Sequence, residues 1–235
     1  MKILAVDTTA ASASAALCED DFLLGEFYVN IKQTHSETLM PEIDGLLRHC
    51  HVDIAEIQLF AVANGPGSFT GVRIGVAAIK GLALPRGIPC AAVSPLEAAA
   101  MNLPFYSGII CAVMDARRNQ VYNGLFESSG EGLTRLCCDR AIGIDELEKE
   151  LIFTEKNVIL VGDGAKLCYN EFKDKHSVSI APERLRFQRA SGVAQAGLRA
   201  FLDGKSVAAA ELRPFYLRLP QAERELKNRS DVLKV

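Results

Sequence analysis

Asn64-Gly-Pro-Gly-Ser-Phe-Thr-Gly-Val-Arg-Ile-Gly75 places four glycines and a proline within one short stretch of the chain. The apolar run before it, residues 59–63, predicts a buried strand, and residues 72–80 predict a helix. Glycines at such a junction allow the backbone to turn tightly. The stretch therefore predicts a strand, a tight turn and a helix.

Glycine-rich turns that open a helix can bind phosphate through backbone N–H groups and the helix dipole. A P-loop would need a glycine five residues after its first glycine, but Gly65 is followed at that distance by Thr70. Gly67 is followed at the same distance by Val72. The dinucleotide-binding fingerprint and a nucleophile elbow around Ser68 fail on spacing as well. Anion binding through some other arrangement stays open.

Gly71, Gly75 and Ala78 recur at about one helical turn, which predicts a stripe of small residues along the helix. Such a stripe lets another helix or a sheet approach closely. Packing on the chain's own sheet and docking of a second protein are both open from the residues alone.

With its flanks the glycine-rich stretch resembles the signature of the TsaB (YeaZ) family. Further matching segments occur in family order at residues 3–9, 34–41, 94–98, 114–122 and 214–218. The resemblance implies a non-catalytic partner in bacterial tRNA threonylcarbamoyladenosine synthesis. It also implies a reduced form of the duplicated actin-like ATPase fold (ASKHA, RNase H-like), with two subdomains.

The chain carries a matching internal repeat. Residues 3–7 and 108–115 are apolar segments that each end in aspartate, and each precedes a further predicted strand, at residues 12–17 and 120–126. The repeat predicts a duplicated α/β architecture, in agreement with the resemblance.

We expect three regions. Residues 1–103 form an N-terminal actin-like subdomain that carries the partner interface, residues 104–210 form a smaller C-terminal actin-like subdomain, and residues 211–235 form a tail. Further expected elements are strands at 23–29, 90–93 and 158–161 and helices at 95–101, 145–151 and 192–202. One more helix begins near Thr34, where Thr34 and Glu37 have the spacing of a capping box. Pro41 implies a kink or a later start.

Composition favours a cytoplasmic protein that folds without disulfides. With 235 residues and 49% hydrophobic content the chain can bury a substantial core. The seven cysteines are odd in number and lack a Cys-x-x-Cys pair, which favours free, largely buried thiols in a reducing compartment. Too few apolar residues precede Asp7 for a signal-peptide core, and Lys80 and Pro85 interrupt the longest apolar stretch, so we expect no membrane segment.

The formal net charge of −3 argues against tight binding of RNA by this chain alone. We therefore expect contact with tRNA within a complex. Residues 211–235 carry six Lys or Arg against four Asp or Glu, Arg213, Arg218, Arg224 and Arg229 among them, and a solvated, loosely ordered tail is the favoured interpretation.

The resemblance implies a cleft between the two halves, where working members of the fold hold a nucleotide at Asp-x-Gly-Thr/Ser turns. In this chain the turns Asp7-Thr8-Thr9 and Asp115-Ala116-Arg117 keep the aspartates and lack the glycines. We therefore expect no ATP hydrolysis by the chain alone. Whether Asp115 with its neighbouring arginines clamps phosphate or forms internal ion pairs is open. The candidate nucleotide or phosphate residues are Asp7, Thr8, Thr9, Asp115, Arg117, Arg118, Gly162 and Gly164.

No catalytic residue, metal site or cofactor is expected. In the run His49-Cys50-His51, adjacent helical residues point about 100° apart and do not converge on one ion. No spacing supplies a base for His35 or Ser36. By resemblance, the metal-binding histidines of the catalytic sister subunit, TsaD, would fall on Pro95 and Ala99, which cannot bind a metal.

The resulting hypothesis is a scaffold and activator that pairs with TsaD through two helices near residues 35–50 and 69–85. The complex, with the small ATPase TsaE, would transfer threonylcarbamoyl to N6 of adenosine 37 in tRNAs reading codons that begin with A. Alone, an exposed apolar helix face would favour a homodimer. The alternative is a stand-alone peptidase or small-molecule kinase using the interdomain cleft. The candidate interface residues are Thr34, His35, Ser36, Leu39, Met40, Ile43, Phe69, Thr70, Gly71, Arg73, Ile74, Gly75 and Ala78.

Overall fold

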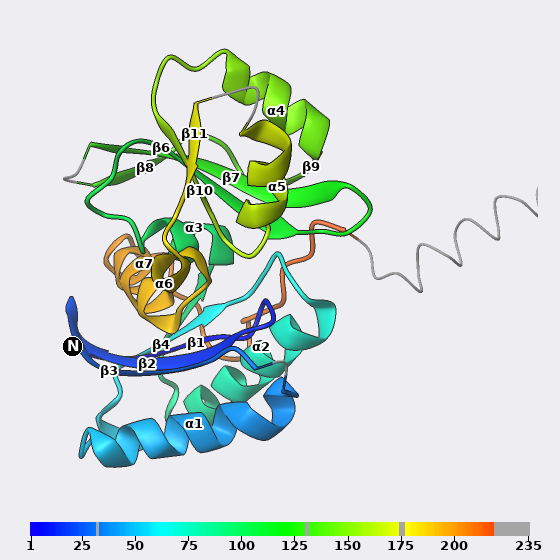
Figure 1. The fold of residues 1–235 in the computed structure, drawn as a ribbon. Coiled ribbons are helices and arrows are strands. Elements are labelled where there is room, and N and C mark those ends of the chain that lie inside the picture. Colours follow the sequence, from blue (N-terminus) through cyan, green and yellow to red (C-terminus); the bar gives the residue numbers. More distant parts are fainter. Residues whose placement is uncertain (32, 130–131, 174–176, 219–235) are drawn as a thin grey trace, which may run out of the picture.

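The computed structural model describes residues 1–31, 33–129, 132–173 and 177–218, and within them the chain forms two halves, each built on a mixed β-sheet (Figure 1). Helices lie on the outer face of each sheet and also between the two sheets (Figure 1). The predicted α/β class is therefore confirmed.

The first sheet is built from β1 (Lys2–Asp7), β2 (Ala13–Glu19), β3 (Phe22–Val29), β4 (Leu59–Ala63) and β5 (Cys90–Val93), in the order β3-β2-β1-β4-β5. Strands β1, β2 and β3 are antiparallel, whereas β4 and β5 run parallel to β1. Its outer face is covered by α1 (His35–His49) and α2 (Phe69–Ala83). Short 3₁₀ turns lie at Ile54–Glu56 and Leu84–Arg86.

The second sheet repeats this topology. It contains β6 (Ser107–Asp115), β7 (Gln120–Ser129), β8 (Leu133–Arg135), β10 (Val158–Val161) and β11 (Val178–Ile180), and β9 (Arg140–Gly143) also pairs with β7. The order β8-β7-β6-β10-β11 matches the first sheet strand for strand, with β6 antiparallel to β7 and parallel to β10. The predicted duplication is confirmed. Helices α4 (Ile144–Ile152), α5 (Ala165–Phe172) and α6 (Glu183–Arg186) complete this half.

Helices α3 (Pro95–Ala100) and α7 (Ala190–Leu202) lie between the two sheets (Figure 1). Helix α7 packs on the inner face of the first sheet, and α3 packs on the second. A Cβ atom at Gly192 of α7 would lie 2.2 Å from the carbonyl oxygen of Ala98 in α3, so the two helices touch closely. The division at residue 103 stays a prediction. Helix α7 follows that point in sequence and nevertheless packs against the first sheet.

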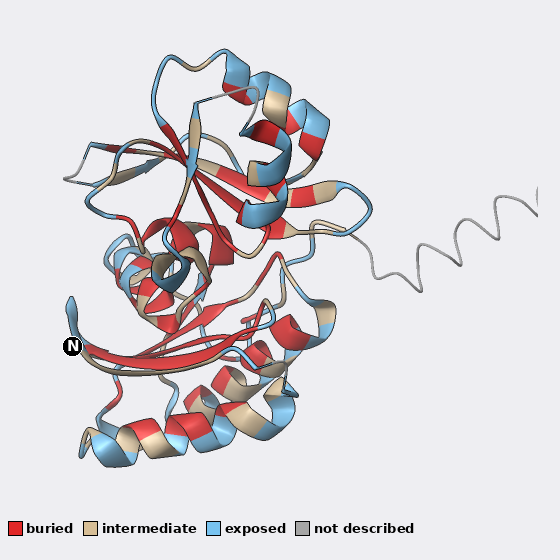
Figure 2. Cartoon of the chain, in the orientation of Figure 1, coloured by how far each residue is buried: buried red, intermediate tan, exposed pale blue. Residues whose placement is uncertain are grey.

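Strands β1, β2 and β4 of the first sheet are buried on both faces, as Figure 2 shows, whereas the edge strand β3 is half-buried to exposed. Leu4 and Val6 of β1 face α1 and α2, while Ile3 and Ala5 face α7, because successive side chains of a strand alternate between faces. This explains why the strands read as continuous apolar runs in the sequence.

The predicted start of α1 is partly wrong. The helix begins at His35 after Thr34, but Thr34 makes no capping hydrogen bond through its side chain, so the capping box does not form. The backbone N–H of Glu37 donates instead to the carbonyl oxygen of Thr34, at 2.9 Å. Pro41 lies inside the helix, so the later start that it suggested does not occur.

All seven cysteines lie in the described residues and are free, in agreement with the prediction of unpaired thiols. Burial raises the pKa of the Cys18 and Cys168 thiols to about 12. Within the described part of the chain, no helix is long and apolar enough to cross a membrane.

Candidate functional site

A cavity of about 450 Å³ lies between the two halves. Its walls come from the turn after β1, the N-terminal end of α2, the end of β6, Asp163 and residues 215–218. The cleft that the resemblance implied is therefore present as a cavity.

The two strand-end aspartates have the same local geometry. Asp7 Oδ1 accepts hydrogen bonds from the backbone N–H and the hydroxyl of Thr9, at 2.8 and 2.7 Å. Asp115 Oδ1 accepts from the backbone N–H of Arg117 at 2.7 Å. Each carboxylate thus closes a turn onto the residue two positions later, which is the geometry of an Asx turn. The repeat noticed in the sequence extends to the side chains of the site.

Asp163, which follows β10, is a cavity residue that sequence reasoning missed. Its Oδ1 accepts from Gln188 Nε2 at 2.9 Å. Burial raises its pKa, and the nearby charge of Asp115 raises it further. Its position between two glycines directly after a buried strand was a usable signal, because the glycines allow the loop to approach the neighbouring strand.

Asp7 lies behind the cavity wall and is almost fully buried. Burial raises its pKa to about 6, against the opposing effect of its hydrogen bonds from Thr9. Its Oδ2 atom is buried without a hydrogen-bond partner in the structure. With this pKa the carboxyl group is largely ionised at neutral pH, and its negative charge is poorly suited to hold a second negative group such as phosphate.

The predicted cleft residues are only partly brought together. Thr9, Asp115 and Arg117 line the cavity, whereas Asp7 and Thr8 are buried behind it. Gly162 and Gly164 pack against the backbone of β6: a Cβ at Gly162 would lie 2.1 Å from the carbonyl oxygen of Val113. These four residues and Arg118 do not line this cavity, and their predicted part in binding a nucleotide or phosphate stays a prediction.

Arg117 and Arg118 sit on a hairpin turn of unusual backbone conformation. Both residues, and Asn119 after them, have positive φ angles of 63°, 57° and 58°. Such angles are rare for residues with side chains. Arg117 forms an ion pair with Asp115 at 3.2 Å, which is the internal pairing considered as one of the two alternatives.

The glycine-rich stretch packs closely against the turn after β1. A Cβ at Gly71 would lie 1.9 Å from the carbonyl oxygen of Thr8, and one at Gly75 would lie 2.6 Å from Thr8 Oγ1. The hydroxyl of Thr8 in turn donates to the carbonyl oxygen of Gly71 at 2.7 Å. Ser68 caps α2 by accepting from the backbone N–H of Gly71 at 3.3 Å. The small-residue stripe at Gly71 and Gly75 therefore packs on the chain's own sheet.

Several predicted interface residues consequently point inward. Leu39, Ile43, Gly71 and Gly75 are buried within the chain, which makes them unavailable to a partner. His35 is half-buried and its Nε2–H donates to the carbonyl oxygen of Ala10 at 2.8 Å. Those that are exposed are Thr34, Ser36, Met40, Thr70 and Arg73, and those that are half-buried include Phe69, Ile74 and Ala78.

The apolar face of α1 is covered by the first sheet and α2, so the expected exposed apolar helix face is also wrong. Amphipathic periodicity marks the buried side of a helix, and it gives no information on whether a second protein covers the helix.

The outward face of α2 carries two small residues, Ala77 and Gly81, that the sequence analysis did not single out. They follow the predicted interface residues Thr70 and Arg73 at one-turn spacing, and all four are exposed. A Cβ at Gly81 would meet nothing within 4 Å. Glycine within an exposed helix destabilises it by roughly 1 kcal/mol relative to alanine, and no contact with the described residues explains its presence here.

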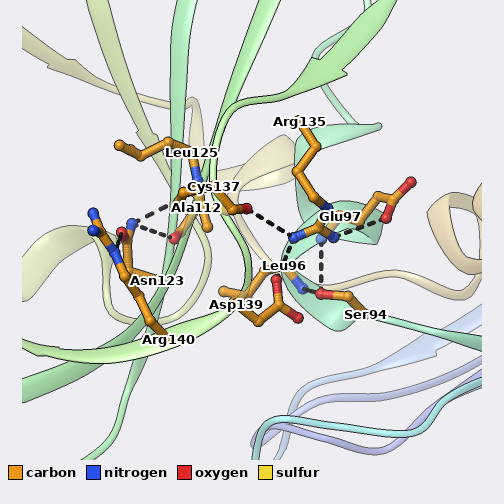
Figure 3. Close-up of polar contacts among 11 residues, drawn as sticks. Ser94, Leu96, Glu97, Ala112, Asn123, Leu125, Arg135, Cys137, Asp139 and Arg140 are labelled. Atoms are coloured by element: carbon orange, nitrogen blue, oxygen red, sulfur yellow. Dashed lines mark hydrogen bonds and ion pairs between the residues drawn. The ribbon is translucent and has the colours of Figure 1, made fainter.

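The positions that correspond by resemblance to metal-binding histidines lie in the core. Pro95 and Ala99 of α3 are buried. Between them, Glu97 Oε2 accepts from Arg135 Nη2 at 2.8 Å, and Arg135 also binds Asp139 (Figure 3). Glu97 thus ties α3 to the second half of the chain.

Among the described residues, no three His, Cys, Asp or Glu side chains gather closely enough to hold a metal ion. The run His49–Cys50–His51 ends α1, and His51 has a positive φ of 53° after the helix.

Comparison with known proteins points to one family. Residues 27–226 match the family model of TsaD, described as tRNA N6-adenosine threonylcarbamoyltransferase. The chain is 34% identical over 228 residues to the tRNA threonylcarbamoyladenosine biosynthesis protein TsaB of Bacillus subtilis, covering 95% of this chain and 96% of that protein.

Solved structures agree. YeaZ from Pseudomonas aeruginosa superposes with a TM-score of 0.80 at 26% identity, over 92% of this chain and 99% of YeaZ. The Lmo2764 protein from Listeria monocytogenes, a candidate N-acetylmannosamine kinase, has a TM-score of 0.50 at 10% identity, over 87% of this chain and all of that one, which supports the fold alone. The reduced, duplicated actin-like fold is thereby confirmed.

Proposed function

The chain belongs to the TsaB family, and on this basis we propose that it is a non-catalytic scaffold and activator subunit of the machinery that modifies tRNA with threonylcarbamoyladenosine. In this role it acts in the cytoplasm with TsaD and TsaE. The complex transfers threonylcarbamoyl to N6 of adenosine 37 in tRNAs reading codons that begin with A. The observation that carries the proposal is the full-length match to relatives named for this biosynthesis.

A non-catalytic role is supported by the aspartate turns and the buried carboxylates of the cleft. The aspartate turns of both halves lack the glycine that lets a phosphate approach the backbone. Asp7 and Asp163 have raised pKa values because they are buried, and each carboxylate is already engaged by groups of the chain. Turnover of a nucleotide or a peptide by the isolated chain would favour the alternative, a small-molecule kinase or peptidase.

We place partner docking on the outward face of α2, around Ala77 and Gly81, together with Met40 of α1. Ala77 and Gly81 present little more than backbone to solvent, so another helix can pack closely against them. Met40 is 44% exposed and adds an adaptable apolar contact. In the absence of TsaD, the same face joins two copies of the chain into a homodimer. Thr70 and Arg73 extend this surface toward the N-terminal end of α2.

The proposal assigns tRNA binding to the complex, because the chain has a formal net charge of −3. Two of the basic residues considered for this role, Arg224 and Arg229, lie outside the described residues. Arg213 and Arg218 are engaged with backbone carbonyl groups of the chain.

The test is complementation of a strain depleted of this protein. The Ala77→Arg variant should fail to co-purify with TsaD and should leave threonylcarbamoyladenosine in bulk tRNA low, as measured by mass spectrometry. A standard interface buries roughly 800 Å² per partner, and a long cationic side chain at its close-packed centre holds the surfaces apart. Ala141→Arg, at an exposed alanine of β9, is the control and should restore both readouts.

Normal assembly and modification with Ala77→Arg would show the docking face to be wrong. Unchanged threonylcarbamoyladenosine after depletion of the protein would show the function to be wrong.

A further inference from the structure

Residues 213–218 form a segment without regular secondary structure at the end of the described chain, and this segment makes contacts with both halves. We call it the strap. The backbone N–H of Phe215 donates to the carbonyl oxygen of Asn64 at 2.7 Å, and Asn64 Nδ2 donates to the carbonyl oxygen of Arg213 at 3.0 Å. Upstream of the strap, Leu212 is buried, and Lys80 Nζ donates to its carbonyl oxygen at 3.2 Å. The expectation of a loosely ordered tail is therefore wrong for residues 211–218, and residues 219–235 lie outside the described residues.

Gly65, the first glycine of the stretch Asn64 to Gly75, leaves the space that this contact requires. Gly65 has a φ of +119°, and a Cβ at this position would lie 2.1 Å from the carbonyl oxygen of Phe215. Any side chain here would both strain the backbone and collide with the strap. The same glycine-rich segment therefore contacts both the strap, at Gly65, and the turn after β1, at Gly71 and Gly75.

A side-chain cluster fixes the next residue of the strap to α2. The rings of Tyr216 and Phe69 lie 4.9 Å apart between centroids. Arg73 stacks over Phe69 with 3.8 Å from its Cζ atom to the ring centroid, and its Nε–H donates to the Tyr216 hydroxyl at 3.0 Å. Arg73 is exposed and belongs to the outward face of α2, so this cluster joins the docking surface to the strap.

The far end of the strap is bound to the second half. Arg218 Nη1 donates to the carbonyl oxygen of Ala116 at 2.8 Å, in the hairpin turn that follows Asp115. Residues 215–218 all line the cavity. The strap therefore contacts both halves and lines the cavity between them.

We propose that the strap is a latch, which holds the two halves closed over the cavity in the free chain and is released from α2 when a partner engages Phe69 and Arg73. The latch follows from the contacts of the chain itself. Its release by docking rests on the proposed function, because it requires a partner on the exposed end of α2. A partner group that takes the Arg73 guanidinium removes the hydrogen bond to Tyr216, and an apolar group that packs on Phe69 competes with the Tyr216 ring.

The latch is tested on the full-length free chain by hydrogen exchange with mass spectrometry. In Tyr216→Ala and in Arg218→Ala, amides of residues 64–69 and of the hairpin at 115–120 should exchange faster than in the wild type. We expect about tenfold for Tyr216→Ala, which removes one ring contact and one hydrogen bond, and less for Arg218→Ala, which removes one hydrogen bond. Tyr216→Phe keeps the ring and should show a smaller effect. Phe153→Ala removes an aromatic ring that is 85% exposed at the end of α4 and should change neither segment.

Faster exchange confined to residues 213–218 in both alanine variants would overturn the latch, because the halves would then be held without it. Faster exchange on both walls of the cavity, with unchanged exchange in β2 and β10, would support it.

Release is tested on the assembled complex of this chain with TsaD. We expect the Phe215 amide and its neighbours to exchange faster in the complex than in the free chain, while amides of α2 become protected. Equal or slower exchange of the strap in an assembled complex would overturn release and leave the docking proposal intact. If no complex forms, the proposed function fails, and the experiments on the free chain still decide the latch.

Discussion

Gly71 and Gly81 belong to the same helix and have opposite surroundings. A Cβ at Gly71 would lie 1.9 Å from the carbonyl oxygen of Thr8, whereas one at Gly81 would meet nothing within 4 Å. The sequence predicted a close approach at Gly71 and left its target open between the chain's own sheet and a partner. Spacing along one helix shows which residues share a face, and the fold decides what that face contacts.

We therefore predict opposite effects of alanine at these two positions. Gly71→Ala should lower the free energy of unfolding by about 3 kcal/mol or more, because the added methyl group collides with backbone that cannot move away cheaply. Gly81→Ala should raise it by about 0.5–1 kcal/mol through helix propensity. Urea unfolding of both variants provides the comparison. Similar stability of the two would contradict the inward packing of Gly71.

Glu42 of α1 is a buried acid whose two carboxylate oxygens have no hydrogen-bond partner in the structure. Burial raises its pKa from 4.5 to about 7. Above pH 4.5 the unfolded chain releases this proton while the folded chain retains it, so the stability contributed at this site falls as the pH rises from about 4.5 to 7 and then stays level.

Glu42→Gln should abolish this dependence and stabilise the protein at pH 8, by up to about 3 kcal/mol, with little effect at pH 4.5. Urea unfolding of variant and wild type at both pH values measures the difference. Asp7, whose pKa is raised to about 6, adds a similar dependence that is common to both proteins and cancels in the comparison. A variant that is equally destabilised at both pH values would contradict a protonated Glu42.

At the scale of elements, apolar periodicity and strand-end residues located β1, β4, β5, β6 and β10 within a residue or two. The sequence analysis missed β8, β9, β11, α5 and α6, which are three to eight residues long and therefore too short to show a clear apolar period. The strap could not be predicted either, since its order comes from contacts with residues 64–73, far away in sequence. From sequence alone, a polar segment at the end of a chain is predicted to be a loosely ordered tail, because its long-range contacts are not visible in the sequence.

Helix α7 depends on a buried ion pair at its start. Arg189 Nε and Nη2 donate to Glu26 Oε2 of β3 at 2.9 and 2.5 Å, and the backbone N–H of Ser191 donates to Glu26 Oε1 at 3.0 Å. The Glu26 side chain is only 4% exposed. The pair anchors a helix from the end of the described chain onto the edge strand of the first sheet.

Arg189→Ala should lower the free energy of unfolding by about 2–3 kcal/mol, because it leaves the Glu26 carboxylate buried with a single remaining donor. Arg48→Ala breaks an exposed pair with Asp44 within α1 and serves as the matched control, with an effect within about 0.5 kcal/mol. Thermal or urea unfolding measures both. Equal effects of the two substitutions would show that the Glu26 pair is no more than a surface contact.

At the scale of the whole molecule, the two sheets have the same topology, and each strand-end aspartate forms the same type of turn. The halves nevertheless differ in the loops that line the cavity. On the first side the turn is packed against the glycines of α2, and on the second it is an arginine-bearing hairpin with positive φ angles. The duplication was readable from the sequence because it follows strand patterns. The divergence was not, because it lies in loops whose conformation depends on what packs against them.

Packing also governs the positions where the resemblance would place a metal site, and the described residues show no cluster of metal ligands. Pro95 and Ala99 stand where the resemblance places the histidines of the catalytic sister subunit. The structure buries Ala99 completely in a cluster with Leu103 and Ile110.

The Pro95→His, Ala99→His double variant should therefore bind no iron or zinc and should be less stable by about 2 kcal/mol or more, because each imidazole is larger than its site and has no polar partner there. Ala141→His, at an exposed position, is the control for adding a histidine. Elemental analysis and thermal unfolding test both statements, and the wild type should purify without a stoichiometric transition metal. One tightly held metal per chain in the wild type, lost on chelation together with threonylcarbamoyl transfer by the isolated chain, would contradict the scaffold role, because a metal bound elsewhere would then supply the chemistry that we assign to the partner.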